Sequence, residues 1–265
     1  EHKEINNEDL SLADRWILAR LNETTEKVNH ALNNYQFMNA GQTLYHFVWN
    51  EFCDWYVEAA KLSLNSTETN KRQATQHTLK STLLDTLKLL HPFLPFITEE
   101  IISSLDPNTA NLIVSSYPKA MQTASNTDSE LFNKTVIEPV EAIRKIRGES
   151  NVQPGKKIPL TLSRYNDSKL VESANTVCNY VEHLAKTDKH QPFLEGRDPS
   201  ETEHAATSVG NCATHFVPLA GLIDIDAETA RLQKEIERKT NTINNLNKKL
   251  SNADFVKNAP AAVVE

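Results

Sequence analysis

The stretch Phe47–Tyr56, with the sequence FVWNEFCDWY, places five aromatic rings within ten residues. In the helical run around it, Leu44, Trp55 and Leu62 share one face, and further aromatic side chains occupy the flanking faces. A helix that is apolar on nearly all sides must be covered by other helices. We therefore predict a central helix within a helical bundle, and we interpret its aromatic residues mainly as core rather than as a stacking surface.

Helical patterns lie on both sides of this segment. A first helix begins after Ser11, because Asp14 three residues later completes a capping-box pattern. A third run ends at the residue before Pro92, whose ring disfavours α geometry there, and Pro95 begins a fourth helix. A fifth helix covers about 132–147 and completes the first body. Only six of the 265 residues are glycine, below the usual share of about 7%, which favours a mainly helical chain.

The period of the pattern changes after Gly155. Apolar and polar residues alternate over 158–163, which predicts a half-buried strand. A helix over about 170–184 follows, and further strands are expected near 204–209 and 214–219. We therefore predict a small second body with the order β-α-β-β.

The last part of the chain carries an apolar heptad repeat. Apart from Thr229 and Lys239, its a and d positions hold Leu222, Ile225, Leu232, Ile236, Ile243, Leu246 and Leu250. This pattern predicts a coiled-coil helix of about 36 Å. One helix cannot bury its own seam, so we expect a partner helix. We also expect a returning helix to begin near Pro260 and the natural chain to continue beyond this sequence.

The charge balance excludes a protein that binds polyanions over its whole surface, because the formal net charge is −7. Any contact with nucleic acid must be a local patch. The three cysteines, Cys53, Cys178 and Cys212, show no disulfide framework and indicate free thiols in a reducing compartment. No run approaches the roughly 20 apolar residues that span a bilayer. We expect a soluble, cytoplasmic protein that does not bind membranes.

Four sequence blocks, taken in order, carry a family resemblance. They are DRWILARL, FVWNEFCDWYVEAAK, LLHPFLPFITEE and IRKIRGESNVQPGKKIPL. Together with GLIDIDAETARLQKEIERK they resemble the C-terminal part of bacterial-type valyl-tRNA synthetases over 10–265. The likeness is weakest over about 164–211, and Ile102 stands where the family usually has Trp. The first three blocks are also similar to isoleucyl- and leucyl-tRNA synthetases, so the corresponding region of one of these is an alternative.

The resemblance implies a mainly α fold in three parts. These are an anticodon-binding helical bundle over 1–150, a small α+β junction over 151–220, and over 221–265 the first helix of a coiled-coil arm that binds tRNA. The implied partner is valine tRNA. Neither an HIGH-like nor a KMSKS-like signature occurs, so we expect catalysis, with ATP and magnesium, from catalytic and editing domains of the same polypeptide. We expect no catalytic residue, metal or cofactor in this part, and a monomeric complete enzyme.

The family places the anticodon stem-loop against the helical bundle. Unstacked bases need aromatic or guanidinium platforms and amide groups for their edges. The first helix and the turn after it offer Arg15, Arg20, Asn33, Asn34 and Phe37. We predict that these residues contact the anticodon. Alternatively, Arg15 is a buried partner of Asp14 or Asp54.

Two basic groups are candidates for phosphate contacts. The first is opposed only by Glu149 and consists of Arg144, Lys145, Arg147, Lys156 and Lys157. The second lies on the predicted arm and consists of Arg231, Lys234, Arg238, Lys248 and Lys249. Each has an ordinary alternative, which is a solvated helix end for the first group and a solvated coiled-coil face for the second. Phosphate contacts would position the RNA without reading its sequence.

Three other patterns do not make a site. The segment GESNVQPGKK has six residues between its glycines where a phosphate-binding loop needs four. Cys212 and His215 lack suitably spaced partners for zinc. Glu51 and Asp54 have no nucleophile beside them, so we predict ion pairs with basic residues of neighbouring helices rather than hydrolysis. A structural protein that self-associates through its heptad helix is the alternative of a different class.

Overall fold

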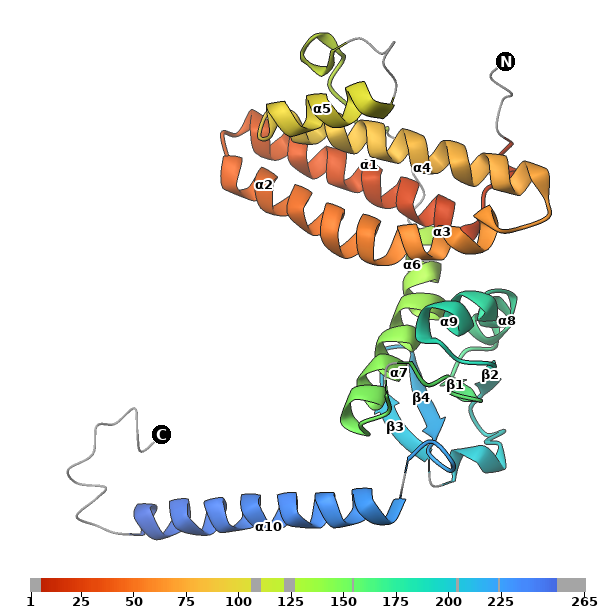
Figure 1. Cartoon of the computed structure of the whole chain (residues 1–265), viewed down its shortest axis with the longest axis vertical. Helices are drawn as coiled ribbons and strands as arrows, with labels where there is room; N and C mark the ends of the chain where they lie inside the picture. The colour runs from red at the N-terminus through yellow and green to blue at the C-terminus, as the bar shows by residue number, and fades with distance from the viewer. Residues whose placement is uncertain are drawn as a thin grey trace.

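The computed structural model describes residues 6–105, 111–121, 127–153, 155–203, 205–223 and 225–251. A bundle of long helices forms one end of the molecule (Figure 1). A smaller body of helices and a sheet adjoins the bundle, and a single long helix extends from that body. The predicted mainly α fold with a small α+β part is therefore confirmed.

The helices of the bundle begin and end largely where local signals predict. Its described elements are α1 (Leu12–Asn33), α2 (Phe37–His46), the π-helix Phe47–Tyr56, α3 (Val57–Leu64), α4 (Thr69–Leu90) and α5 (Pro95–Leu105), with 3-10 turns at Asn7–Asp9 and Leu112–Val114. The predicted capping box is present, because the Ser11 hydroxyl accepts the Asp14 N–H at 3.1 Å and Asp14 accepts the Ser11 N–H at 3.0 Å. α4 has His91 as its C-cap, and Pro95 begins α5, as predicted.

The aromatic segment is a ten-residue π-helix rather than an α-helix. Five of its residues are buried: Phe47, Glu51, Phe52, Trp55 and Tyr56. Their spacing of four and five residues fits a helix whose hydrogen bonds reach back five residues. Four of the five rings are therefore core, as predicted. The prediction that the helix is covered on nearly all sides is wrong, because Tyr45 is 64% and Trp49 is 54% exposed.

Asp14 ties three helices together at the start of α1. Its carboxylate is wholly buried and accepts hydrogen bonds from the hydroxyls of Tyr56 and Thr75, both at 2.7 Å. It also accepts the Ser11 hydroxyl at 2.7 Å. Burial raises the pKa of Tyr56, so the phenol stays protonated and remains a donor. Because a buried carboxylate without donors is costly, these bonds fix α1, the π-helix and α4 relative to one another.

The smaller body packs helices against a four-stranded sheet. Its described elements are α6 (Thr127–Phe132), the π-helix Asn133–Ile137, α7 (Glu138–Glu149), β1 (Thr161–Tyr165), α8 (Ser168–Thr176), α9 (Cys178–Ala185), β2 (His190–Leu194), the 3-10 turn Ser200–Thr202, β3 (Ala205–Val209) and β4 (Ala213–Pro218). The strand order is β2-β1-β4-β3, with β1 and β2 parallel and the other pairs antiparallel. One hydrophobic core runs from Trp16 in α1 to Val217 in β4, so the two parts pack together.

The strands differ from the prediction in three ways. β3 and β4 lie where strands are predicted, but β1 begins later, and Ile158 makes only an isolated bridge with Thr187. The predicted helix over 170–184 is broken at Val177 into α8 and α9. β2, which contains Pro192, was not predicted. A proline is tolerated there because β2 is an edge strand, where one side of the ladder needs no N–H donors.

Glu138, the first residue of α7, joins that helix to the turn between β3 and β4. Its Oε1 accepts the N–H of Cys212 at 2.9 Å and of Ala213 at 3.0 Å, and lies 3.5 Å from His215 Nε2. Burial alone would raise the pKa of Glu138, but these donors together lower it. A methyl group at Gly210 would come within 2.7 Å of the Glu138 carboxyl carbon. Glycine therefore allows the carboxylate to reach the turn.

α10 (Ile225–Leu250) extends from the smaller body (Figure 1). The heptad side chains that the structure describes on α10 are exposed, from 46% for Leu232 to 64% for Ile236, whereas Leu222, a predicted heptad residue before α10, is buried in the core. Within the described residues no second helix covers them, and the expected returning helix near Pro260 lies outside those residues. The coiled-coil pairing therefore stays a prediction. No helix in the described part of the chain has the length and apolar character needed to cross a membrane.

We expect Asp14→Ala to lower the free energy of unfolding by about 3 kcal/mol, because it leaves the buried hydroxyls of Tyr56 and Thr75 without their acceptor. Urea denaturation followed by circular dichroism measures this change. The control is Tyr56→Phe, which removes one donor and should cost about 1 kcal/mol. Equal losses for the two variants would contradict a joining role for Asp14.

We expect the stability of this protein to fall as the pH drops from about 6.5 towards 3, partly because of His190 in β2. Burial lowers the pKa of His190 from 6.5 to about 3. Between these values the unfolded chain binds a proton that the folded chain excludes, which favours unfolding by up to about 1.4 kcal/mol per pH unit. Urea unfolding of wild type and His190→Asn at pH 7, 6, 5 and 4 tests this, and parallel stability curves would contradict it.

Candidate nucleic-acid interface

The turn between α1 and α2 presents an exposed surface of rings and amides. Phe37 is 58% exposed, and Asn33 and Asn34 lie beside it on the same turn. The structure therefore brings three of the predicted anticodon-contact residues together. It adds Tyr35 at 82% and Met38 at 75% exposure, which were not predicted. The Tyr35 and Phe37 rings stand edge to face, with centroids 6.4 Å apart.

Tyr35 owes its exposure to the backbone at the end of α1. Its φ is +57°, in the left-handed region that usually holds glycine after a helix. That conformation costs a residue with a Cβ about 1 kcal/mol. The Tyr35 N–H donates to Leu32 O at 3.1 Å and the Gln36 N–H donates to Ala31 O at 2.8 Å, which holds the turn in place. Strained backbone of this kind concentrates at binding sites.

The chain segment that forms this turn carries no charged side chain. No Asp, Glu, Lys or Arg occurs over 28–50, although such residues make up 24% of the chain. This gap in the charge pattern is the signal by which sequence analysis could have found Tyr35 and Met38. Rings without nearby carboxylates can stack on unpaired bases, and amides such as Asn34 can bond to base edges.

The α4–α5 turn lies at the same end of the bundle as the α1–α2 turn (Figure 1). It exposes Leu94 at 51%, Phe96 at 90% and Ile97 at 52%. A groove of about 360 Å³ beside it is lined in part by His91, Phe96 and Glu99. This end of the bundle therefore carries apolar residues on two neighbouring turns.

The two predicted arginines lie elsewhere and are engaged in ion pairs. Arg15 is about 27 Å along α1 from Asn33, and its Nε is 3.2 Å from Asp128. The alternative that Arg15 pairs with Asp14 or Asp54 is therefore wrong. Direct contact of Arg15 with the anticodon stays a prediction.

Arg20 and Glu51 form a bidentate pair across two helices. Arg20 Nε donates to Glu51 Oε2 at 2.8 Å and Nη2 donates to Oε1 at 2.7 Å, while Glu23 pairs with the same guanidinium. The hydrogen bond to Glu51 is the main cause that raises the pKa of Arg20. The predicted ion pair of Glu51 with a neighbouring helix is confirmed, and its carboxylate is not available for hydrolysis. Asp54 stays exposed.

The two arginines of the first basic group hold parts of the fold together. Arg144 donates to Leu184 O at 3.1 Å and lies 5.1 Å from the centre of the Trp55 ring. Arg147 donates to Ala185 O at 3.1 Å. These bonds join α7 to α9 and to the bundle.

The remaining lysines of this group face solvent. Lys156 Nζ donates to Leu222 O at 2.7 Å, close to the start of α10. Lys157 Nζ is 3.1 Å from Asp188, and both side chains are more than half exposed. Lys145 is exposed on α7. Lys145 and Lys157 are therefore accessible to phosphate groups.

The basic residues of α10 are mostly exposed as well. Arg231, Lys234, Arg238 and Lys248 are all exposed, and the side chain of Lys249 lies outside the described set. Arg231 pairs with Glu235 at 3.4 Å and donates to Glu149 O at 3.4 Å. The arm can thus present positive charge along its length, although carboxylates are interspersed.

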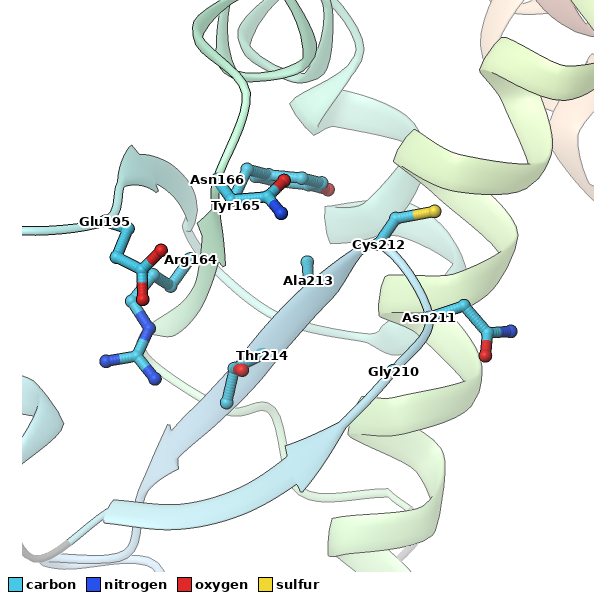
Figure 2. A pocket seen from close by; sticks show the side chains of 9 residues that line it. All are labelled: Arg164, Tyr165, Asn166, Glu195, Gly210, Asn211, Cys212, Ala213 and Thr214. Atoms are coloured by element: carbon cyan, nitrogen blue, oxygen red, sulfur yellow. The ribbon is translucent and has the colours of Figure 1, made fainter.

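A polar pocket of about 180 Å³ lies where β1 and β4 meet in the smaller body. Figure 2 shows Arg164 and Glu195 on one side of it and Cys212 on the other, with its thiol turned towards the helix. Arg164 pairs with Asp198 at 3.0 Å. Burial raises the pKa of the Cys212 thiol, so it is not an activated nucleophile. Among the described residues, no three His, Cys, Asp or Glu side chains gather in a way that could hold a metal.

Comparison with known proteins identifies the class of this chain. Residues 14–162 match the family described as the anticodon-binding domain of tRNA ligase, and residues 224–265 match the valyl tRNA synthetase tRNA-binding arm. The first match covers more than half of the chain, which therefore belongs to the family of tRNA-ligase anticodon-binding domains. This match includes the α1–α2 turn described above.

Curated relatives show which kind of tRNA ligase this chain resembles. The valine–tRNA ligase of Oceanobacillus iheyensis is 38% identical over 267 residues, which cover 97% of this chain and 29% of that protein. Those of Bacillus subtilis and Staphylococcus saprophyticus are 37% and 36% identical, covering 96% and 97% of this chain. The chain corresponds to the C-terminal, non-catalytic portion of valyl-tRNA synthetases, and it spans less than a third of the length of these relatives.

We expect Arg20→Met to lower the free energy of unfolding by about 3 kcal/mol, because it leaves the carboxylate of Glu51 buried without its partner. The double variant Arg20→Met/Glu51→Met should recover most of this loss, since both charges are removed. Urea denaturation measures the stability. Binding of valine tRNA to the double variant tests the predicted RNA contact of Arg20. A stable double variant with unchanged affinity would mean that Arg20 acts only in the fold.

Proposed function

We propose that this chain is the tRNA-binding portion of a valine–tRNA ligase and that it holds valine tRNA by the anticodon loop. The observation that carries this proposal is the uncharged surface of the α1–α2 turn, within a matched anticodon-binding domain. Unpaired bases stack on Tyr35 and Phe37, and the amides of Asn33 and Asn34 bond to base edges. Base identity is thus read at this turn.

Phosphate contacts give this interaction its strength and its salt dependence. Lys145 and Lys157 contact the RNA backbone on the smaller body, and Arg231, Lys234 and Arg238 do so along α10. Arg144, Arg147 and Lys156 support these contacts by holding α7, α9 and the start of α10 together. The match of residues 224–265 to a tRNA-binding arm supports the role of α10.

The complete enzyme uses this grip to place the acceptor end of the tRNA at a distant active site. Two-point binding converts the second contact into an intramolecular event, which raises its effective concentration. In this proposal other domains of the same polypeptide join valine to tRNA with ATP and magnesium. The complete enzyme works as a monomer in the cytoplasm, where the three cysteines, free in the structure, stay reduced.

We expect Phe37→Ala to weaken binding of valine tRNA by about tenfold, because one stacked base is worth about 1–3 kcal/mol. Asn34→Ala should reduce discrimination between valine tRNA and an anticodon-swapped tRNA more than it reduces affinity. Filter binding with both tRNAs measures both effects.

A matched control is available for Asn34. Asn34 and Asn175 both donate from Nδ2 to the carbonyl oxygen four residues earlier, at 2.8 Å, but Asn175 lies on α8. Asn175→Ala should leave both affinities unchanged. An equal loss of affinity for the two tRNAs in Asn34→Ala and Phe37→Ala would argue against base reading at this turn.

A further inference from the structure

A second pair of exposed rings lies on the same helix, beyond the α1–α2 turn. Tyr45 lies in the last turn of α2 and Trp49 lies in the π-helix, and their ring centroids are 6.4 Å apart. Exposed apolar side chains that lie next to one another mark contact sites more often than single ones do. The opposite side of this helix is core, with Phe47 at 1% and Tyr56 at 0% exposure. The helix that carries the two rings is therefore held in place by the core of the bundle.

The solvent-facing side of this segment has a regular composition. Its exposed residues come in neighbouring pairs, which are Tyr45 with His46, Trp49 with Asn50 and Cys53 with Asp54. Each of the first two pairs combines an aromatic ring with a neutral or titratable polar group. Asp54 is the first exposed carboxylate, and it marks the end of the uncharged surface.

The carboxylate nearest to the rings is turned away from them. Glu51 is only 7% exposed and is held by the two hydrogen bonds from Arg20. Its Oε1 also lies 3.3 Å from His46 Nδ1, which holds the imidazole at the edge of the exposed rings. The charge of Glu51 is therefore compensated by Arg20 inside the bundle, which weakens its repulsion of a phosphate chain.

We propose that Tyr45 and Trp49 form a second stacking platform for unpaired RNA bases, continuous with the α1–α2 turn. This inference rests on the proposed function and extends it to residues that the turn does not include. Phe37 and Trp49 are on the order of 15 Å apart along the helix axis. The bound RNA is thus an extended single strand of several nucleotides, as the loop of a tRNA can supply.

The chemistry of the surface favours RNA over a protein partner. Aromatic rings with amides such as Asn50, and without carboxylates, match the needs of bases, which offer π-faces and polar edges. A protein interface of useful strength needs a broad apolar centre. Here the apolar part is a narrow row, because Gln42 and Asn50 are exposed along the rings.

Tryptophan fluorescence can test this proposal directly. Of the three tryptophans, Trp16 is 1% and Trp55 is 8% exposed, so quenching by acrylamide reports mainly on Trp49. Adding valine tRNA should quench the emission and shield it from acrylamide, because stacking covers the indole. A double-stranded RNA of the same length, which offers phosphates but no unpaired bases, should not shield it.

Variants separate stacking from packing. Trp49→Phe should keep the affinity for valine tRNA within about twofold and abolish the fluorescence change, since a ring remains. Trp49→Ala and Tyr45→Ala should each weaken binding by about fivefold or more. Val209→Ala removes part of an exposed apolar side chain on β3 of the smaller body and should not change the fluorescence response. Circular dichroism checks that each variant is folded.

The outcomes distinguish this inference from the proposed function. If the wild-type chain does not bind valine tRNA at low salt, the proposed function fails. If valine tRNA binds but neither quenches nor shields Trp49, and Trp49→Ala binds as wild type does, only the second platform is overturned. Shielding of Trp49 that rises with protein concentration in the absence of RNA would also overturn it, because the surface would then join copies of this chain.

Discussion

The buried carboxylate of Asp14 is the interaction on which the bundle depends. It accepts hydrogen bonds from the hydroxyls of Ser11 before α1, Tyr56 in the π-helix and Thr75 in α4. One carboxylate therefore fixes three elements. A carboxylate that has lost all contact with water needs such a complete set of donors. The position of the π-helix relative to α1 follows from this set. Because α2 continues directly into the π-helix, the α1–α2 turn and the exposed rings of Tyr45 and Trp49 are positioned by the same set of bonds.

Charged side chains also join separate elements in the smaller body. Glu138 holds α7 to the β3–β4 turn, and Arg147 holds α7 to the end of α9. Trp16 stacks on Phe132 with centroids 4.8 Å apart and donates to Asn133 at 3.2 Å, which connects α1 to the second π-helix. One core runs through both parts and includes Leu222, just before α10.

This distribution of charge bears on how the chain holds RNA. Several basic side chains predicted to contact RNA make internal hydrogen bonds instead. They are Arg20, predicted to contact the anticodon, and Arg144 and Arg147, predicted to contact phosphate. The surface proposed for the bases carries no ionised group over 28–50. Stacking and amide contacts of the kind we propose there would depend little on salt, whereas the proposed phosphate contacts of the lysines and the arm would depend on it. In this proposal, selectivity and attraction come from different regions.

The sequence by itself determined the features that depend on neighbouring residues. The capping box at Ser11, the end of α4 before Pro92, the start of α5 at Pro95 and the sites of β3 and β4 follow from local backbone rules. Its motifs also identified the family. Only the tertiary structure decided the π-helix, the edge strand β2 and the partner of Arg20. The reason is distance along the chain: Glu51 lies 31 residues from Arg20, and Pro192 is acceptable only because no strand pairs on its outer side. Local patterns carry no information on such contacts, so the exposure of Tyr45 and Trp49 could not be read from helical spacing alone.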